Sequence, residues 1–308
     1  MKNGKLIGNM AMGVSKTFSG LNQNALRYLL PRWMNAYSGV LMRLGFGAVM
    51  FWIIGLFTRK TSVKTTMRQK LVLLGIGAFF MTGYMIGLLM GLTYTTPVSS
   101  SIFLCLEPVF VFIMSMMFFH EKATSRKIIG IVMGLSGALL CICTQKQSDV
   151  ASNPALGNMF CLLSTLMYSG YLIVSAKVLK GLDTVTVSKW TFTGGALTAI
   201  IPVLIVGFDA PVIREGLFST PMLVLLFVLV FPSCLSYLLV DVGLKHLSPT
   251  TVAIYGYVIL IVSTVVSYIL GQDKFDWFQL AAILLIVGSV YFVELAESKS
   301  PIPSPKQA

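Results

Sequence analysis

Charged side chains are scarce in this chain of 308 residues. Aspartate, glutamate, lysine and arginine make up 11% of it and hydrophobic residues 56%, whereas a soluble domain carries about 25% charged residues. The mean hydropathy of +0.84 agrees with this composition. A soluble fold is therefore excluded, and we expect an all-α polytopic membrane protein whose surroundings are a lipid bilayer.

Residues that carry metal or nucleotide chemistry are few as well. The chain has two histidines, and its five cysteines lie in apolar runs without CxxC spacing, so we expect neither a metal site nor a cofactor. No GxxxxGK[ST] sequence is present, so ATP would have to be hydrolysed by another chain. A membrane enzyme would need acidic residues or histidines clustered at one interface, but the eleven acidic residues are spread along the chain.

The net charge of +12 is the one feature that suggests a nucleic-acid partner. The basic residues, however, lie in short loops between apolar runs, where they indicate membrane orientation instead. With the N-terminus inside the cell, the inner segments hold sixteen lysines and arginines and the outer loops hold five. We therefore expect both termini in the cytoplasm and no nucleic-acid binding.

Ten apolar segments are predicted to be transmembrane helices. Among the clearest is the stretch of about two dozen mostly apolar residues from Thr96, which is long enough to cross a hydrocarbon core of roughly 30 Å. Residues 297–308 are expected to form a disordered cytoplasmic tail. The ten segments are Leu6–Leu29, Asn35–Phe57, Leu71–Leu92, Thr96–Phe119, Ile128–Cys143, Ala155–Val178, Val187–Val206, Thr220–Val242, Ser248–Leu270 and Trp277–Ala296.

An internal repeat divides the chain into residues 1–150 and 151–296. When the sequence is slid by 152 positions, sparse identities coincide without a gap, for example Gly91 with Gly243 and Pro97 with Pro249. Each half then holds five helices, and an odd number makes the second half insert upside down relative to the first. Two inverted five-helix repeats are typical of transporters that work by alternating access, with the site near the midplane between the halves.

Three ionisable side chains lie at about the same depth in these helices. Lys16, Arg43 and Glu107 are each about nine to eleven residues from a helix end and hence near the bilayer centre, where a charge costs about 2.5 to 3.5 kcal/mol. We expect them to meet in the interior and to bind substrate. Because their charges sum to +1, an anionic or zwitterionic metabolite is favoured, with Lys16 as the preferred ligand. The alternative is a buried Arg43–Glu107 pair with Lys16 extended toward the interface.

Glu107 is followed by a proline, which marks a break in its helix. Pro108 removes the hydrogen bond to the carbonyl of Leu104 and bends the helix there. As the only carboxylate predicted at the membrane centre, Glu107 is the candidate for proton coupling, although it could also serve only to lock helix packing. The corresponding residues of the second half, 258–260, contain neither an acid nor a proline, so we expect the kink once only.

Further candidate ligands are polar or aromatic residues inside the predicted helices. Tyr168 and Tyr171 form the favoured pair, because residues three apart share a helix face. Asp241 lies one turn from Lys245 and is expected to form an interfacial ion pair with it. For each aromatic residue plain packing is the alternative to substrate binding. The remaining candidates are Asn9, Asn22, Tyr84, Trp190, Tyr237 and Tyr255.

These features resemble the drug/metabolite transporter superfamily, in its ten-helix branch built from two EamA-type repeats. The resemblance covers about Leu6 to Ala296 and departs from the family pattern at Ser19, where an aromatic residue is usual. It rests on Gly20-x-Asn22 with Arg27 five residues on, Arg43, Leu106-Glu107-Pro108, Glu121, and the glycines Gly130, Gly134 and Gly137.

The resemblance implies a secondary transporter of small metabolites or drugs, often an exporter, in a bacterial inner membrane. It names no substrate and leaves open whether the protein is a homodimer. The alternatives are a polytopic membrane enzyme acting on lipid-linked groups and a non-transporting sensor or scaffold.

A cysteine introduced by Ser62→Cys tests the predicted orientation. Five basic residues lie between Thr58 and Lys70, and this bias predicts a cytoplasmic loop. In intact cells the new cysteine should be protected from a membrane-impermeant thiol reagent, whereas Ser148→Cys, in the predicted outer loop, should react. Rapid labelling at position 62 in intact cells would overturn the orientation.

Overall fold

The structure, a computed structural model, describes residues 2–57, 65–119, 125–144, 151–178, 182–247, 252–253, 255–274 and 276–297. The basic loop around Ser62 and most of the predicted tail, residues 298–308, lie outside these ranges. The elements are α1 (Lys2–Leu29), α2 (Ala36–Phe57), α3 (Met67–Ile76), η2 (Gly77–Met81), α4 (Thr82–Tyr94), α5 (Pro97–Leu104), α6 (Glu107–Phe119), α7 (Ser125–Thr144), α8 (Pro154–Val178), α9 (Thr184–Val206), η3 (Pro211–Arg214), α10 (Thr220–Val230), η4 (Phe231–Leu235), α11 (Ser236–His246), α13 (Gly256–Ile269) and α14 (Trp277–Glu297).

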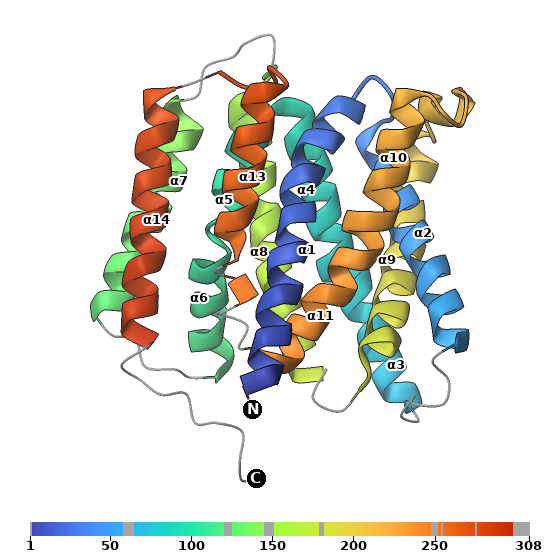
Figure 1. Cartoon of the computed structure of the whole chain (residues 1–308), viewed down its shortest axis with the longest axis horizontal. Coiled ribbons are helices and arrows are strands. Elements are labelled where there is room, and N and C mark those ends of the chain that lie inside the picture. Colours follow the sequence, from blue (N-terminus) through green and yellow to red (C-terminus); the bar gives the residue numbers. More distant parts are fainter. Residues whose placement is uncertain are drawn as a thin grey trace.

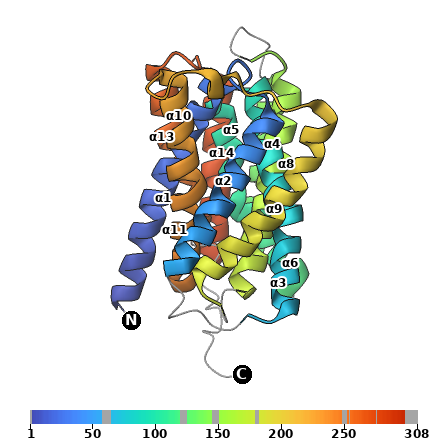
Figure 2. The same cartoon turned by 90° about the vertical axis from the view of Figure 1, so that its right-hand side faces the viewer.

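The helices stand side by side in one bundle (Figure 1). α1 begins and α14 ends at the same end of this bundle, which we call the N-terminal end; the other is called the opposite end. After a turn of 90° the first turns of α1 stand apart from the other helices (Figure 2), and Lys5, Leu6 and Ile7 are exposed there.

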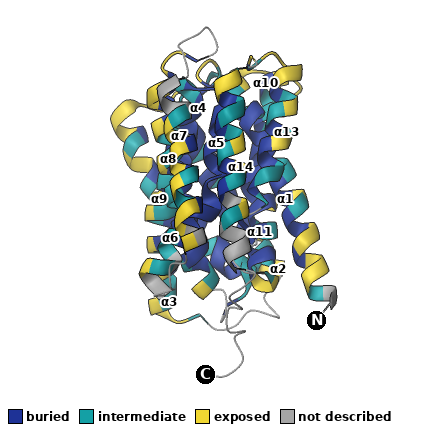
Figure 3. Ribbon diagram, turned by 90° about the vertical axis from the view of Figure 1, so that its left-hand side faces the viewer, coloured by how far each residue is buried: buried dark blue, intermediate teal, exposed yellow. Residues whose placement is uncertain are grey.

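The outside of the bundle is largely apolar, and polar side chains are buried between the helices. Figure 3 shows buried residues where helices meet and exposed residues along the outer faces. Large hydrophobic side chains such as Phe79, Leu204 and Ile205 are exposed, whereas Lys16 and Arg43 are buried. This is the distribution that a lipid environment requires, because ionisable groups in membrane helices face the bundle interior.

Six helical stretches of the described residues are long and apolar enough to cross a membrane. They are Ala36–Phe57, Met67–Tyr94, Pro97–Met114, Pro154–Val178, Thr184–Val206 and Thr220–His246, and shorter apolar helices lie within α7, α13 and α14. The predicted all-α, multi-pass class is therefore confirmed. The count of ten crossings stays a prediction, since α1 is not among these stretches.

The two halves carry irregular features at corresponding positions. A π-helical turn, η2, lies between α3 and α4, and another, η4, lies between α10 and α11. α4 ends at Tyr94 and α11 at His246, and α7 begins at Ser125 and α14 at Trp277, so that each pair is 152 positions apart. α4 packs against α8, as α11 packs against α1. This pattern supports the repeat inferred from the sequence.

The first helices of the two halves run in opposite directions. Arg27, near the end of α1, donates a hydrogen bond of 3.2 Å to the carbonyl of Leu92, and the carbonyl of Tyr94 accepts one of 3.3 Å from the backbone N–H of Asn153, just before α8. The end of α1 and the start of α8 therefore lie at the same end of the bundle, as an inverted arrangement requires.

The expectation that the second half lacks a kink is wrong. Helical residues Val252 and Ala253 are followed by a turn at Tyr255, and α13 starts only at Gly256. This break contains no proline, and tertiary packing accompanies it instead. Gly256 packs against the break of the first half, where an added Cβ would lie 3.4 Å from the carbonyl oxygen of Leu104. The interrupted helices of the two halves thus meet in the bundle.

A close approach of α3, η2 and α9 depends on two glycines. A Cβ built on Gly77 would overlap the carbonyl oxygen of Thr191, and one built on Gly194 would overlap the carbonyl oxygen of Leu74. Both obstacles are backbone atoms, which cannot turn aside. Small residues of this kind allow the backbones of membrane helices to pack tightly.

The substitution Gly77→Ala should therefore destabilise the folded protein by about 1 to 3 kcal/mol, the usual cost of overpacking. Gly75→Ala, on the same helix and with nothing within 4 Å of its added Cβ, is the matched control and should leave stability unchanged or raise it slightly. Thermal unfolding of the purified variants in detergent measures the difference. Equal midpoints for the two variants would contradict the close packing.

Candidate functional site

Glu107 begins a new helix in the middle of an interrupted segment. The side chain of Thr96 caps α5 and Pro97 starts it; α5 ends at Leu104, and α6 begins at Glu107. The N-terminus of a helix favours a negative charge. The predicted break at Pro108 is therefore confirmed, and it places Glu107 in the first turn of α6.

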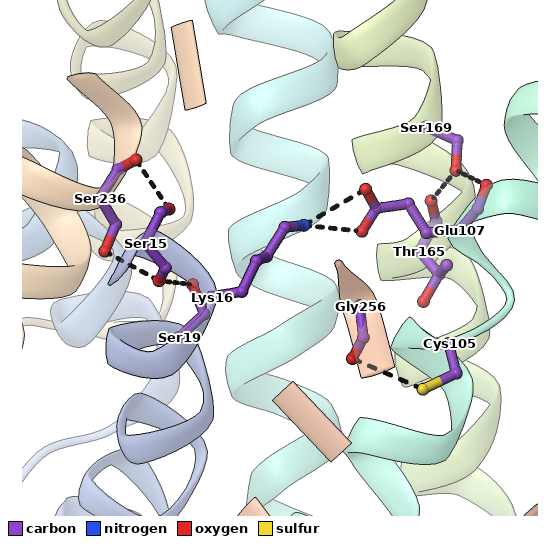
Figure 4. Close-up of polar contacts among 9 residues, drawn as sticks. All are labelled: Ser15, Lys16, Ser19, Cys105, Glu107, Thr165, Ser169, Ser236 and Gly256. Atoms are coloured by element: carbon purple, nitrogen blue, oxygen red, sulfur yellow. Dashed lines mark hydrogen bonds and ion pairs between the residues drawn. The ribbon is translucent and has the colours of Figure 1, made fainter. Parts of the chain in front are cut away.

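Side-chain hydrogen bonds tie the break to neighbouring helices. The Ser169 hydroxyl on α8 donates to the carbonyl of Thr165 at 2.8 Å and also lies 3.3 Å from the backbone carbonyl of Glu107, and Cys105 Sγ donates to the carbonyl of Gly256 at 3.6 Å. Figure 4 shows these contacts. Irregular backbone within a membrane bundle is tolerated where it is buried against other helices.

Lys16 forms a buried ion pair with Glu107. Its Nζ lies 3.1 Å from Oε2 and 3.3 Å from Oε1, and the two side chains are 2% and 0% exposed. In Figure 4 the lysine extends from α1 across the gap to α6. Nζ also lies 5.1 Å from the ring centre of Tyr168, within cation–π range. The alternative of an Arg43–Glu107 pair with Lys16 extended toward the interface is therefore wrong.

Arg43 is a buried cation that no acidic side chain pairs with among the described residues. Its Nε donates to Ser233 Oγ at 2.8 Å, whereas its Nη1 is buried without a hydrogen-bond partner. Ser233 lies in η4 and donates in turn to the carbonyl of Val228 at 2.7 Å, five residues back. Arg43 thus has a spare donor in this structure and Lys16 is paired with Glu107, whereas the role of Lys16 as a substrate ligand stays a prediction.

A small polar cavity adjoins these charges. The space open to the centre of a water molecule is about 20 Å³, which holds roughly one water and no metabolite. The cavity lies between α1, α2, α4, α8 and the α10–α11 segment. It is lined by Ser15, Ser19, Asn22, Arg43, Tyr84, Tyr168, Pro232, Ser236, Tyr237 and Val240.

The tyrosines predicted for the site divide into two groups. Tyr84, Tyr168 and Tyr237 line the cavity, and the rings of Tyr84 and Tyr168 are 4.8 Å apart. Tyr171 stacks on Tyr168 at 5.9 Å, but its hydroxyl points to Asp241 at 3.2 Å. The spacing of Tyr168 and Tyr171 therefore placed them together correctly, although only one faces the cavity.

Three predicted ligands lie away from the cavity. Asn9 is exposed near the start of α1. The ring of Trp190 meets that of Trp52 edge to face at 5.5 Å, with Lys70 and Lys189 over it. Tyr255 lies in the turn before α13 and packs against the main core. Asn22 does line the cavity, and its Oδ1 is buried without a partner.

A larger hollow of about 530 Å³ lies on the outer surface between α2 and α9. It is lined mostly by apolar side chains, among them Leu41, Val49 and Leu197. Without a charged group in it, this groove offers a metabolite no polar recognition, and it faces the surroundings of the bundle. We therefore place the candidate site at the small polar cavity.

The arrangement of two broken helices around buried charges invites comparison with known proteins. The sequence model of the EamA-like transporter family matches residues 6–143 and again residues 155–295. The chain belongs to the EamA-like transporter family. Each half of this transporter thus matches one unit of the family, in agreement with the resemblance inferred from its motifs.

Relatives of the transporter are themselves described as transporters. The Bacillus subtilis (strain 168) protein "Uncharacterized transporter YyaM" is 23% identical over 284 residues, covering 91% of this chain and 90% of that protein. An "Uncharacterized transporter" of Archaeoglobus fulgidus is 22% identical over 202 residues, which is 66% of this chain and 68% of its own. These relatives point to a transporter rather than a membrane enzyme.

A solved crystal structure shares the fold. It aligns with a TM-score of 0.64 at 15% identity, covering 98% of this chain and 100% of that chain. At such low identity the match shows the fold alone.

Serines that the sequence-based predictions do not include form part of the site. Ser15 Oγ donates to the carbonyl of Ser236 at 2.9 Å, and Ser236 Oγ donates to the carbonyl of Ser15 at 3.3 Å, which joins α1 to α11. A signal for them is present in the sequence, because Ser15, Ser19 and Asn22 are spaced four and three residues apart and hence share one helix face.

Asp241 corrects a second expectation. It was predicted to form an interfacial ion pair with Lys245, but its side chain is fully buried and binds the hydroxyls of Tyr171 and Ser188. The i, i+4 spacing was misleading, since Lys245 is exposed and Asp241 faces the neighbouring helices. Asp241 is therefore a fourth buried ionisable group, and its charge and those of Lys16, Arg43 and Glu107 sum to +1 only while Asp241 is protonated.

Single and double substitutions of the ion pair test its role in folding. Lys16→Met should destabilise the transporter by on the order of 3 kcal/mol, because it leaves Glu107 buried without its cation. Glu107→Gln should do the same by isolating Lys16. The double variant should recover much of the loss, since neither charge remains. Thermal unfolding in detergent measures all three.

The exposed Lys177, in the last turn of α8, provides the control through Lys177→Met, which should unfold like the unchanged protein. Additive losses in the double variant would show that the two side chains do not act as a pair.

Proposed function

We propose that this protein is a secondary transporter that moves a small anionic or zwitterionic metabolite, such as an amino acid, across the bacterial inner membrane by alternating access. Export is the direction that the family resemblance implies. The observation that carries the proposal is the spare donor of Arg43, buried beside a polar cavity too small for a metabolite.

Arg43 is suited to bind the anionic group of the substrate. Its guanidinium has five donors in a planar fork that matches a carboxylate or phosphate. Ser233 accepts from Nε at 2.8 Å and so fixes the orientation of the fork, while Nη1 has no partner. A substrate oxygen at Nη1 would satisfy a donor that is otherwise costly to bury.

The ion pair of Lys16 and Glu107 would serve as the second part of the site. An ammonium group of a zwitterionic substrate could replace Lys16 beside Glu107, and Lys16 could then turn toward the substrate carboxylate. Such an exchange keeps every buried charge paired, which avoids the cost of an isolated ion. A permanent cation without an anionic group would leave Arg43 unmatched.

Access from the opposite end is closed by polar side chains. Gln23 accepts from Ser100 at 3.0 Å, and the Gln272 side chain donates to the backbone carbonyl of Asn24 at 3.1 Å. Several acceptors here, including Asn24 Oδ1 and Gln272 Oε1, are buried without partners. When the helices at this end separate, water can form hydrogen bonds with these polar groups, so this closure is suited to opening.

Access from the N-terminal end is closed by tight contact between α1 and α11. Met12 packs against Gly243, and the Cβ position of Gly8 lies 2.9 Å from a side-chain atom of Leu247. Since both ends are closed around about 20 Å³ of space, a substrate can enter only if one closure opens. Opening of each in turn is what alternating access means for two inverted repeats.

Arg43→Gln tests the proposed ligand. The loss of a charge-assisted hydrogen bond, about 1.5 to 3 kcal/mol, corresponds to an affinity roughly ten- to 150-fold lower for carboxylate-bearing compounds. The measurement is a thermal-stabilisation screen of the purified protein with amino acids, organic acids, nucleobases and cationic drugs.

Arg214→Gln changes an exposed arginine in η3 and should bind as the unchanged protein does. Unaltered binding of anionic compounds by the Arg43 variant, or a preference of the unchanged protein for permanent cations, would refute the proposed substrate class.

A further inference from the structure

Asp241 is a buried carboxyl group that no cation balances. Its Oδ1 accepts from the Tyr171 hydroxyl at 3.2 Å, and its Oδ2 lies 2.6 Å from Ser188 Oγ. Tyr171 and Ser188 are themselves 0% and 1% exposed. Within the described residues Asp241 makes no ion pair, in contrast to Glu107, which Lys16 neutralises. Glu107 and Asp241, the two fully buried acids of the described residues, therefore have opposite surroundings.

The charged groups on the helices around Asp241 are engaged elsewhere or lie at the surface. On α9, Lys189 lies over the rings of Trp52 and Trp190, at 4.5 and 5.8 Å from their centres. On α1, Lys16 binds Glu107 and Lys5 is exposed.

On α8 and α11 the groups near Asp241 are uncharged or at the surface. Lys177 on α8 is exposed, as are Lys245 and His246 on α11, and Tyr237 lies one turn before Asp241. Tyrosines supply only hydroxyl groups. An ionised Asp241 would thus be offset by the hydroxyl groups of Ser188 and Tyr171 and by the surface charge of Lys245, without a buried cation beside it.

The neutral form of Asp241 keeps both contacts if the hydrogen bond with Ser188 reverses its direction. A carboxylic acid has one O–H to donate and one carbonyl oxygen to accept with. Ser188 Oγ, which donates to an ionised Oδ2 at 2.6 Å, can turn its own proton away and accept that of Oδ2, while Tyr171 still donates to Oδ1. Because burial of an isolated carboxylate is costly and this cost disappears when the group takes up a proton, the closed bundle favours a bound proton at Oδ2.

The ionised form also has a donor in reserve. Ser175, one turn beyond Tyr171 on α8, is buried, and its hydroxyl makes no hydrogen bond although it lies near the Tyr171 hydroxyl. When Asp241 loses its proton, Ser175 can turn and donate to Tyr171, which strengthens the donation of Tyr171 to the carboxylate. A group with partners for both states is suited to take up and release a proton.

Asp241 also lies next to the proposed substrate site. Its partner Tyr171 stacks on Tyr168 at 5.9 Å, and Tyr168 faces Lys16 Nζ at 5.1 Å. Tyr237, one turn before Asp241 on α11, lines the cavity. A change of charge at Asp241 would therefore act on Tyr168 and Tyr237, two tyrosines that line the proposed substrate cavity.

We propose that Asp241, in place of Glu107, is the residue at which the transporter binds and releases the coupling proton. This role rests on the proposed transport function. In the closed protein the proton sits on Oδ2, between Asp241 and Ser188. Release to water leaves a carboxylate held by Tyr171 and Ser188, and the transferred species is a proton alone, so no oxidant or co-reactant is needed.

Infrared difference spectroscopy of the purified protein, titrated from acid to alkaline pH without any substrate, tests the proposal. The unchanged protein should show the carbonyl stretch of a protonated Asp241, which shifts in D₂O and disappears as the pH rises. Asp241→Asn should abolish this band. Glu107→Gln and the exposed control Asp209→Asn should retain it.

Should Asp241→Asn fold poorly, Tyr171→Phe provides a second readout. It removes the donor to Oδ1 and should move the frequency of the same band. A band that survives in Asp241→Asn, disappears in Glu107→Gln, or neither titrates nor exchanges with D₂O would overturn the proposal.

This experiment contains no substrate, so its outcome is independent of the test of Arg43. If the infrared band of Asp241 is absent while anionic compounds still bind, only the proposed proton site is refuted. If anionic compounds do not bind while the band of Asp241 is present, the proposed substrate class is refuted instead.

Discussion

The buried ion pair of Lys16 and Glu107 is the interaction on which the centre of the bundle depends. Each charge alone would be costly in a membrane interior, and the pair is tolerable only while both partners stay together. The contact, 3.1 Å long, joins α1 to the interrupted helix α5–α6 within the first half. Any motion that opens the cavity must therefore either move these two helices together or supply a replacement charge, which is a task that a substrate can perform.

The irregular segments of the two halves give this centre its geometry. The break before Glu107 presents its carboxylate at the start of α6, and the π-turn η4 places Ser233 within 2.8 Å of Arg43 Nε. Such interruptions are rare in helices and occur often at functional sites. Their recurrence at corresponding positions of both halves suggests why the site lies where the repeats meet. In an uninterrupted α-helix, Glu107 and Ser233 would lie on other faces of their helices.

The sequence was sufficient for the class, the repeat and the break at Pro108, because hydropathy, spacing and proline act locally. It could not decide whether Lys16 or Arg43 pairs with Glu107, since depth in a helix leaves the rotation of that helix undetermined. Asp241 was misassigned for the same reason, as its i+4 lysine looked like a surface partner. The break at Tyr255 was missed because tertiary contact at Gly256, and not a proline, accompanies it.

Access to the cavity from both sides of the membrane is the most direct test of the account. Ser19 lines the cavity, and Ser19→Cys, in a variant whose native cysteines are replaced, could be labelled with an impermeant thiol reagent in vesicles of either orientation. We predict labelling from each side, slowed from both by a bound carboxylate-bearing compound. Labelling from one side alone, or from neither, would contradict alternating access around this site.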